Sequence, residues 1–243
     1  MATRSLVAPL LLVCTTVLAH DAPIRFSVSD STTMPLIDLQ DGSPIDGIIY
    51  DLYLRIAEKL AREPEWVVTA RTRTQPLLAE DHVDANCYMN PAWLTEHDAS
   101  YRWSVPFMTL RTALVAAADA PKVGLADLRG ERIGTVLGFQ YPEAAEQFAN
   151  GELIRDDART ENQVLEKLDA GRNRYAIATE TSVDWFNKDR PACCHLQVIE
   201  RLMEFPVHCL VRDDSDAHAQ EIINVLEEME RDGEFEEIQA QYR

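Results

Sequence analysis

The chain has 243 residues, a hydrophobic content of 46% and a formal net charge of −18. Its length and hydrophobic content are typical of a soluble globular protein with a normal core, in one large domain or two modest ones. This acidity disfavours binding to nucleic acids and to anionic membrane surfaces, although a basic pocket for a small ligand can exist within an acidic surface.

Residues 1–19 have the pattern of an export signal. Arg4 supplies a positive start, an apolar run covers residues 6–13, and small residues before His20 form a cleavage site. The apolar run is too short to span a bilayer as a helix, and no later segment is long enough. We therefore expect a periplasmic or secreted mature protein that begins near His20 and does not insert into a membrane.

Four cysteines remain after cleavage at this site: Cys87, Cys193, Cys194 and Cys209. One or two disulfides are expected in an oxidising compartment, but their connectivity does not follow from the sequence. The adjacent pair lacks the spacing of a metal site, and the chain has neither a CxxC nor an HxxxH motif. We expect no bound metal.

Hydrophobic periodicity predicts alternating strands and helices. Residues 24–28 form a first strand, residues 48–60 repeat apolar side chains at helical spacing, and residues 66–70 form a second strand. This βαβ order implies parallel strands whose loops meet at one edge of a sheet, where ligands of open α/β sheets bind. Further strands are expected near 82–87, 132–137, 175–178, 196–199 and 207–211, an apolar run covers 113–118, and further helices are expected at 76–79, 162–168, 183–187, 217–232 and 235–242.

Two loops reach that edge after the first two strands. One begins at Asp30 and the other at Arg71. Arg71 and Arg73 can present cations to a ligand there, and the alternative is that they are solvated loop charges.

Aromatic and amide side chains follow the third strand. Tyr88, Asn90 and Trp93 lie in this loop, and such side chains suit the lining of a small-molecule pocket. The alternative is an aromatic cluster that closes the core.

Residues 127–147 read as a strand, a glycine loop and a helix. The loop begins with Gly138, Phe139 and Gln140, and Pro142 stands at the first turn of the expected helix. Backbone N–H groups at a positive helix end suit a carboxylate or another anion. An ordinary turn between strand and helix is the alternative.

The order of these pieces resembles extracellular solute-binding protein family 3, the polar amino-acid binding proteins of ABC transporters. The resemblance implies an α/β protein with the two-lobed type II periplasmic-binding-protein fold, in which each lobe is a sheet flanked by helices and a ligand cleft lies at the hinge. The matching segments are GIIYDLYLRIAEKL, HVDANCYMNP, WSVPF, LADLRGERIGTVLGF, LEKLDAGRNRYAIATE and LEEMERDGEFEEIQAQYR.

The resemblance also implies the division of the chain and its partners. Lobe I would contain residues 22–112 and 205–243, and lobe II residues 113–204, with closure of the lobes trapping the ligand. The implied partners are a small-molecule ligand and the membrane permease of an ABC importer, and the chain is expected to be a monomer without a cofactor.

The expected ligand contacts depart from those of the family. No arginine stands at the offset of the family's carboxylate clamp, and Arg102 is the nearest. The family's amine-binding aspartate falls on Thr179, with Glu180 beside it, and Gly138-Phe139-Gln140 replaces the hydroxyl-rich anion loop. The α-amino-acid clamp is therefore only partly present.

The leading hypothesis is a periplasmic binding protein, not an enzyme, that captures a small polar or anionic, amino-acid-like solute for an ABC importer. Two alternatives stay open. One is a periplasmic dehydratase-like enzyme on the same fold, with Glu180 as general acid or base. The other is an accessory protein of a periplasmic oxidoreductase.

Overall fold

The structure is a computed structural model that describes residues 22–94, 101–213 and 217–243. The expected export signal lies outside these residues. Within the described ranges, no helix combines the length and the apolar character needed to cross a membrane.

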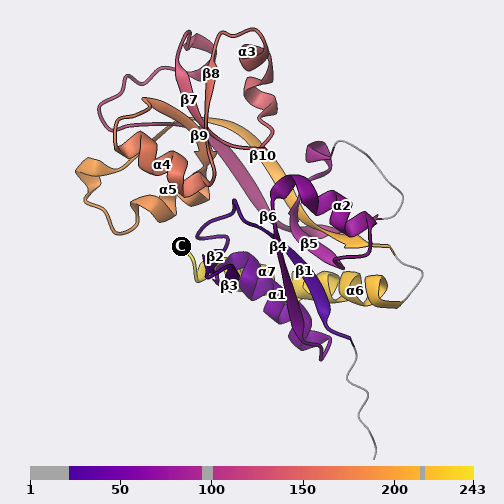
Figure 1. The fold of residues 1–243 in the computed structure, drawn as a ribbon. Helices are drawn as coiled ribbons and strands as arrows, with labels where there is room; N and C mark the ends of the chain where they lie inside the picture. The colour runs from indigo at the N-terminus through magenta and orange to yellow at the C-terminus, as the bar shows by residue number, and fades with distance from the viewer. Residues whose placement is uncertain (1–21, 95–100, 214–216) are drawn as a thin grey trace, which may run out of the picture.

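An eight-stranded mixed sheet runs through the molecule in the order β4-β1-β5-β10-β6-β9-β7-β8 (Figure 1). β1 pairs in parallel with β4, and β7 pairs in parallel with β8 and β9, whereas β6 and β10 are antiparallel to their neighbours. The strands are β1 Ile24–Ser29, β4 Pro64–Thr69, β5 Ala85–Met89, β6 Tyr101–Ala116, β7 Arg132–Val136, β8 Ile154–Ala158, β9 Tyr175–Thr179 and β10 Gln197–Arg212, and β2 Asp38–Gln40 pairs with β3 Ser43–Asp46 in a separate hairpin.

β6 and β10 connect two lobes (Figure 1). Each has 16 residues, and the two pair along their length. Lobe I contains β1, β4 and β5, and lobe II contains β7, β8 and β9. The lobe boundaries predicted at residues 112/113 and 204/205 fall inside these two long strands, and they remain a prediction.

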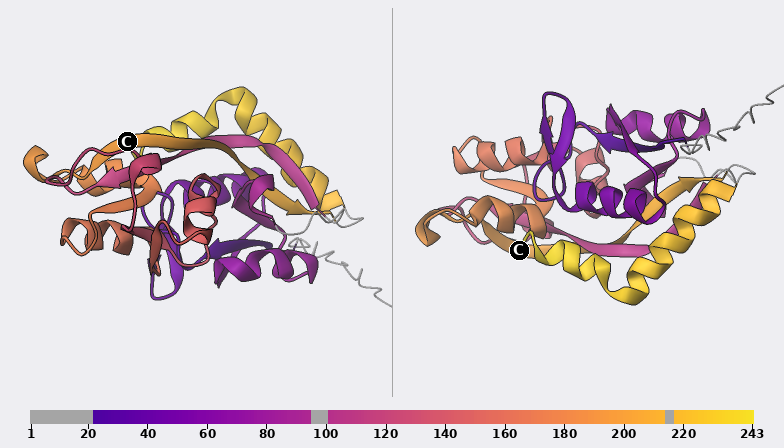
Figure 2. Two further views of the ribbon diagram at one scale, coloured as in Figure 1. Left: turned by 90° about the horizontal axis from the view of Figure 1, so that it is seen from above. Right: turned by 90° about the horizontal axis from the view of Figure 1, so that it is seen from below.

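Helices cover the sheet in both lobes. Figure 2 shows α6 lying along β6 and β10 on the outer side of lobe I. In α1, Ile49, Leu52 and Ile56 are buried in the core of lobe I, with Leu60 partly buried beside them, which agrees with the apolar spacing of residues 48–60. The helices of lobe I are α1 Ile48–Lys59, α2 Thr74–Ala79, α6 Ala217–Asp232 and α7 Glu234–Ala240, and those of lobe II are α3 Ala145–Ala149, α4 Glu161–Asp169 and α5 Glu180–Asn187.

The core of lobe II has two apolar clusters on opposite faces of its sheet. Ala113 and Val115 belong to one cluster, and Leu114 belongs to the other. Side chains of a strand alternate between faces, so a continuous apolar run such as 113–118 indicates a strand buried on both sides.

The α/β fold class is confirmed. The prediction missed β8 and the β2–β3 hairpin, and it divided β6 and β10 into separate shorter runs. β8 is a charged edge strand in which Ile154 is 46% exposed, and such a strand lacks the apolar pattern on which the prediction relied.

The structure resolves the cysteine connectivity that the sequence left open. Cys87 of β5 and Cys209 of β10 form a disulfide, and both are fully buried. Cys193 and Cys194 are exposed free thiols on a 3-10 turn after α5, with their sulfur atoms 3.3 Å apart.

This arrangement predicts which cysteines react with a thiol reagent. Alkylation of the folded, unreduced protein should label the peptide that contains Cys193 and Cys194, because both thiols are exposed. Peptide mass mapping should recover Cys87 and Cys209 as a linked pair, labelled only after unfolding and reduction. A linked peptide that joins Cys87 or Cys209 to the 193–194 pair would contradict this connectivity.

Candidate binding site

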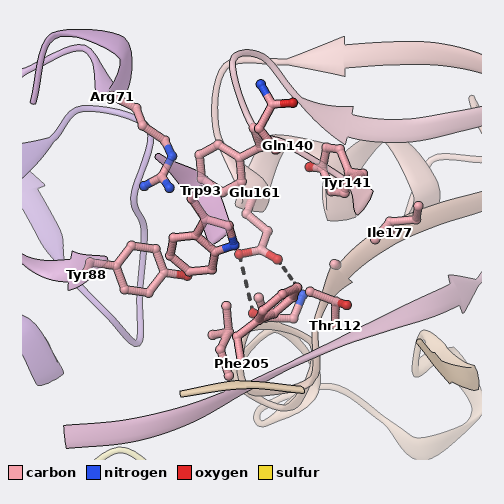
Figure 3. A pocket seen from close by; sticks show the side chains of 13 residues that line it. Arg71, Tyr88, Trp93, Thr112, Gln140, Tyr141, Glu161, Ile177 and Phe205 are labelled. Atoms are coloured by element: carbon pink, nitrogen blue, oxygen red, sulfur yellow. Dashed lines mark hydrogen bonds between the residues drawn. The ribbon is translucent and has the colours of Figure 1, made fainter. Parts of the chain in front are cut away.

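Side chains from both lobes enclose a small cavity of about 40 Å³ (Figure 3). Lobe I contributes Arg71, Tyr88 and Trp93 from the loops and strand ends of its sheet, and lobe II contributes Phe139, Tyr141 and Glu161. The long strands that link the lobes provide Leu110, Thr112 and Phe205, and the remaining walls come from Gln140 and the end of β9, Ile177, Ala178 and Thr179.

Arg71 is the cation of the site. It begins the 3-10 turn Arg71–Arg73 directly after β4. It therefore lies at the carboxyl-end edge of the parallel strands, where a ligand is expected. Its guanidinium carbon lies 5.0 Å from the ring centroid of Trp93, 4.9 Å from that of Phe139 and 6.0 Å from that of Tyr88. These rings attract a cation through their π faces.

Among the residues that the structure describes, no acidic side chain pairs with Arg71. Within the described residues, the guanidinium has neither an ion pair nor a hydrogen bond to another group. Desolvation by burial lowers the pKa of Arg71, and electrostatic interactions with Tyr88 and Tyr141 act in the opposite direction. A cation without an acidic partner that lines a cavity is suited to an anionic ligand group.

Glu161 is the buried acid among the residues that line the cavity (Figure 3). It is the first residue of α4, whose N-terminus is capped by the Thr160 hydroxyl, and it is 7% exposed. The Thr179 N–H donates to its Oε1 at 2.5 Å, and the Ser182 hydroxyl donates to its Oε2 at 2.9 Å. Burial raises the pKa of Glu161, although these hydrogen bonds act in the opposite direction.

Hydrogen bonds within lobe II fix the conformation of the Gly138 loop. The Phe139 N–H donates to the Val136 carbonyl at 3.1 Å, and Arg155 donates to the Phe139 and Val136 carbonyls at 3.2 and 3.0 Å. The helix expected after Pro142 is a 3-10 turn followed by five residues of α3. The chain after this loop therefore lacks the longer helix whose positive N-terminal end the sequence suggested as an anion site. The loop instead places the ring of Phe139 against Arg71.

Six of the predicted site residues line the cavity: Arg71, Tyr88, Trp93, Phe139, Gln140 and Thr179. Thr179 also caps α5 through its hydroxyl. Gly138 lies next to Thr72, in a neighbouring hollow that also contains Arg71 and Trp93. The loops after β4, β5 and β7 therefore converge on one place.

The other predicted site residues lie outside the cavity. Asp30 and Arg73 are exposed. Asn90 is buried. Its side-chain amide donates to the Pro206 carbonyl and accepts from the Ala92 N–H, so both of its polar atoms form structural hydrogen bonds. Glu180 forms an ion pair with Arg201 at 2.7 Å, near the crossing strands.

Arg102, the alternative candidate for a carboxylate clamp, lies away from the cavity. Its guanidinium pairs with Asp213 at 2.7 Å and donates to the Gln220 side chain. The structure therefore leaves Arg71 as the cation at the cavity.

Sequence reasoning missed Glu161, Tyr141, Thr112 and Phe205. Thr160-Glu161 ahead of the apolar helix pattern marks a helix N-terminus, but this order does not indicate that Glu161 is buried at the cavity. Thr112 and Phe205 lie within β6 and β10, and nothing in the sequence distinguishes them from other residues of these strands.

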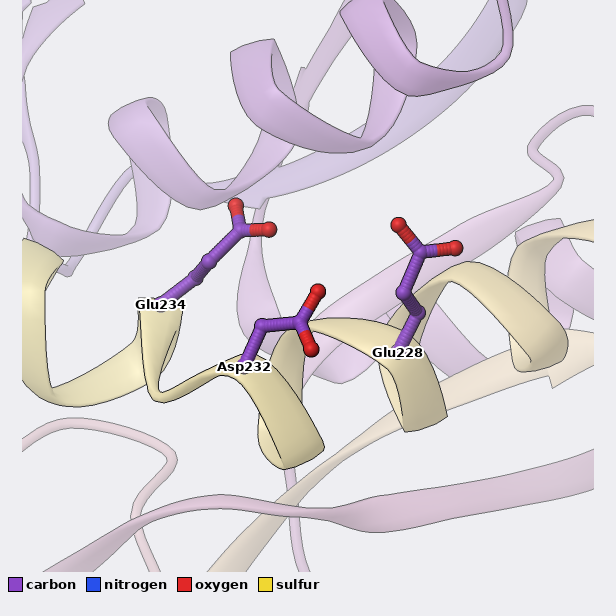
Figure 4. A group of neighbouring side chains, drawn as sticks. All are labelled: Glu228, Asp232 and Glu234. Atoms are coloured by element: carbon purple, nitrogen blue, oxygen red, sulfur yellow. The ribbon is translucent and has the colours of Figure 1, made fainter.

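Within the described ranges, one group of three acidic side chains, Glu228, Asp232 and Glu234, lies close enough to hold a metal ion (Figure 4). Lys59 already lies 2.8 Å from Glu228 and 2.7 Å from Glu234. Partial burial raises the pKa of Glu234, but hydrogen bonds from Lys59 and Arg55 outweigh this effect and lower it. The cluster is an ion-pair network between helices of lobe I, and we assign no metal to it.

The model of the bacterial extracellular solute-binding proteins, family 3, matches residues 27–243. The chain belongs to this family. The family resemblance noted in the sequence is confirmed, and with it the two-lobed α/β fold that solute-binding proteins of this kind adopt. A comparison with curated protein sequences gives no match.

Several solved structures are similar to this chain along nearly its whole length. An ancestral arginine-binding protein bound to arginine has 19% identity and a TM-score of 0.75, covering 92% of this chain and 99% of that one. A histidine kinase sensor domain with similarity to periplasmic binding proteins has 21% identity and a TM-score of 0.72, with 90% and 95% covered. The ancestral amino acid-binding protein AncCDT-1, a precursor of cyclohexadienyl dehydratase, has 17% identity and a TM-score of 0.74, with 91% and 95% covered. At these identities the similarity concerns the fold.

Proposed function

We propose that this solute-binding protein captures a small polar or anionic solute in the cavity between its lobes and delivers it to an ABC importer in the periplasm. The observation that supports this most is the Arg71 guanidinium, which faces the cavity between aromatic rings of both lobes and has no acidic partner among the described residues. An anionic ligand group would complete its coordination.

Closure of the lobes on a ligand is supported by the fact that both lobes contribute residues to the cavity. Phe139 belongs to lobe II, and Arg71, Tyr88 and Trp93 belong to lobe I. A ligand held between Arg71 and Glu161 would therefore stabilise the closed arrangement, and the two crossing strands would act as the hinge.

A thermal-shift screen tests this proposal. Purified protein is heated with amino acids, organic acids and amines, each in excess over its expected dissociation constant. A ligand at about 100 times its Kd stabilises the folded state by roughly 2.7 kcal/mol, which is about 5–11 °C for a chain of this size. No response to any of the three classes would contradict the binding role.

A second candidate function is an enzyme of the dehydratase kind. The specific observation in its favour is Glu161, a buried carboxylate whose pKa is raised by burial and which faces the cavity, as a general acid requires. The sequence suggested Glu180 for this role, but Glu180 is paired with Arg201. Incubation of the protein with each stabilising acid, followed by product analysis, separates the two functions, because a binding protein leaves its ligand unchanged.

A further inference from the structure

Two adjacent thiols, Cys193 and Cys194, form a chemically reactive group that the binding function does not use. Both side chains are exposed, and their sulfur atoms lie 3.3 Å apart. Neither residue lines the cavity between the lobes. Reactive cysteines are accessible to solvent, whereas buried structural cysteines are inert. The pair therefore differs from the buried disulfide of Cys87 and Cys209.

Hydrogen bonds fix the turn that carries the two thiols. The Cys194 N–H donates to the Pro191 carbonyl at 2.8 Å within the 3-10 turn Ala192–Cys194. After the turn, the side chain of Asn187, the last residue of α5, donates to the Leu196 carbonyl at 2.9 Å and accepts from the Leu196 N–H at 3.0 Å. The segment is thus closed at its base against α5, and the two thiols are held side by side at the surface of lobe II.

The short distance between the sulfur atoms favours reaction with a disulfide. A thiolate attacks one sulfur atom of a disulfide, forms a mixed disulfide and releases the other sulfur atom as a thiolate. A second thiol at 3.3 Å can then attack the mixed disulfide within the same molecule, which is far faster than attack by a thiol from solution. The hydrogen bond with Cys193 raises the pKa of Cys194, so one sulfur atom keeps its proton while the other acts as the nucleophile.

The other described cysteines cannot compete for this pair. Cys87 and Cys209 are bonded to each other and fully buried, so they do not exchange with Cys193 or Cys194 while the protein is folded. A disulfide between the adjacent residues would be exposed, and it would close a small ring that contains their planar peptide bond. Exposed or strained disulfides are reduced more easily than buried structural ones, so this bond would form reversibly.

We propose that Cys193 and Cys194 form a redox-active dithiol on lobe II, which an external disulfide converts reversibly to a disulfide between the two adjacent residues. In this step the S–S bond of the oxidant and two S–H bonds of the protein are broken, and the S–S bond between Cys193 and Cys194 is formed. The protein loses two electrons and two protons, and the external disulfide gains them and leaves as two thiols. An external dithiol reverses the reaction. The modification does not depend on the proposed binding function.

Reaction with glutathione disulfide, followed by alkylation and mass measurement, tests this proposal. Folded protein with free thiols at 193 and 194 is incubated with a large excess of glutathione disulfide, and the remaining thiols are then alkylated. The expected product has lost two hydrogen atoms, carries no glutathione, stays monomeric and is not labelled at Cys193 or Cys194. A low concentration of dithiothreitol should restore labelling of both residues, while the buried disulfide of Cys87 and Cys209 remains intact.

The single variants Cys193→Ser and Cys194→Ser are matched controls. Each lacks the thiol that attacks the mixed disulfide, so a glutathione adduct should accumulate on the remaining cysteine. We expect this adduct to be at least tenfold more abundant in either variant than in the unmodified chain. Both side chains are exposed, and an unchanged melting temperature shows that each variant is folded.

Three results would overturn the proposal. A stable glutathione adduct on the unmodified chain would show that the second thiol does not attack the mixed disulfide. A covalent dimer linked through Cys193 or Cys194 would show that the thiols pair between chains. Full labelling of both thiols after incubation with glutathione disulfide would show that the pair is not redox-active. The ligand of the cavity is tested separately by the thermal-shift screen, so none of these results affects the proposed binding function.

Discussion

Replacement of Arg71 by methionine is expected to weaken binding of an anionic ligand by about 10- to 150-fold. This range corresponds to roughly 1.5–3 kcal/mol, the usual contribution of hydrogen bonds to a charged group. Methionine keeps an unbranched apolar stem that can pack against Trp93 and Phe139, which flank the guanidinium. The dissociation constant of an anionic ligand found in the thermal-shift screen, measured by titration calorimetry, gives the effect directly.

The same variant should not lower the melting temperature of the unliganded protein. Desolvation lowers the pKa of Arg71, so the charged form is less stable at this position than in water. Within the described residues, no acidic side chain forms an ion pair that would offset this desolvation. Arg71 is half-buried, and removal of a partly desolvated charge without an acidic partner is neutral or stabilising more often than destabilising. Loss of the cation–π contacts, each worth about 0.5–1 kcal/mol, acts in the opposite direction.

Arg73→Met provides a matched control. Arg73 lies in the same turn, two residues from Arg71, and its side chain is exposed. Its replacement should change neither affinity nor melting temperature. Unchanged affinity in Arg71→Met, or an equal loss in both variants, would exclude Arg71 as the specific anion contact. A melting temperature several degrees lower with normal affinity would assign Arg71 a structural role instead.

The elements with strong hydrophobic periodicity could be predicted from the sequence. α6 was predicted with the bounds that the structure gives, and α1 ends one residue earlier than predicted. Gly233 lies between the helices predicted at 217–232 and 235–242, and it adopts a positive φ of 77° between α6 and α7, which a glycine tolerates without strain. The charged edge strand β8 was missed because strand pairing, and not an apolar pattern, defines it.

The binding site was predictable only as far as it depends on loops at strand ends. Arg71, Tyr88 and Trp93 follow β4 or belong to the end of β5 and its loop, and their place in the chain was enough to put them at the ligand edge. Which of Arg71 and Arg73 faces the cavity depends on the course of a three-residue turn. No pattern in the sequence specifies that choice.

Glu161 illustrates the part of the site that required the structure. Its burial arises from β9 and α5, which supply Thr179 and Ser182 as donors from positions 18 and 21 residues away. From the sequence alone, an acid in the first turn of a helix is expected to be solvated and to interact with the helix dipole. The long-range contacts, and not the local pattern, change it into a buried group with a raised pKa.

Removal of the disulfide between Cys87 and Cys209 should have the largest effect on stability. The bond joins residues 122 positions apart, and a loop of this length corresponds to roughly 4–5 kcal/mol in the chain-entropy description, with native disulfides usually contributing about 2–5 kcal/mol. The double variant Cys87→Ala/Cys209→Ala should therefore melt roughly 5–15 °C lower than the unmodified protein. Calorimetric or spectroscopic melting checks the shift, and Cys193→Ser/Cys194→Ser, which alters exposed free thiols, should melt normally.

Affinity for the ligand should change much less than stability in the disulfide variant. Cys87 is followed directly by Tyr88 of the cavity, but β5 is also held by Tyr53, whose hydroxyl accepts from the Cys87 N–H at 2.7 Å and donates to the Ser27 carbonyl at 3.0 Å. These hydrogen bonds and the pairing of β5 with β10 keep Tyr88 in place after the sulfur atoms are removed. A loss of affinity as large as that in Arg71→Met, measured well below the melting temperature, would show instead that the disulfide positions the aromatic wall of the site.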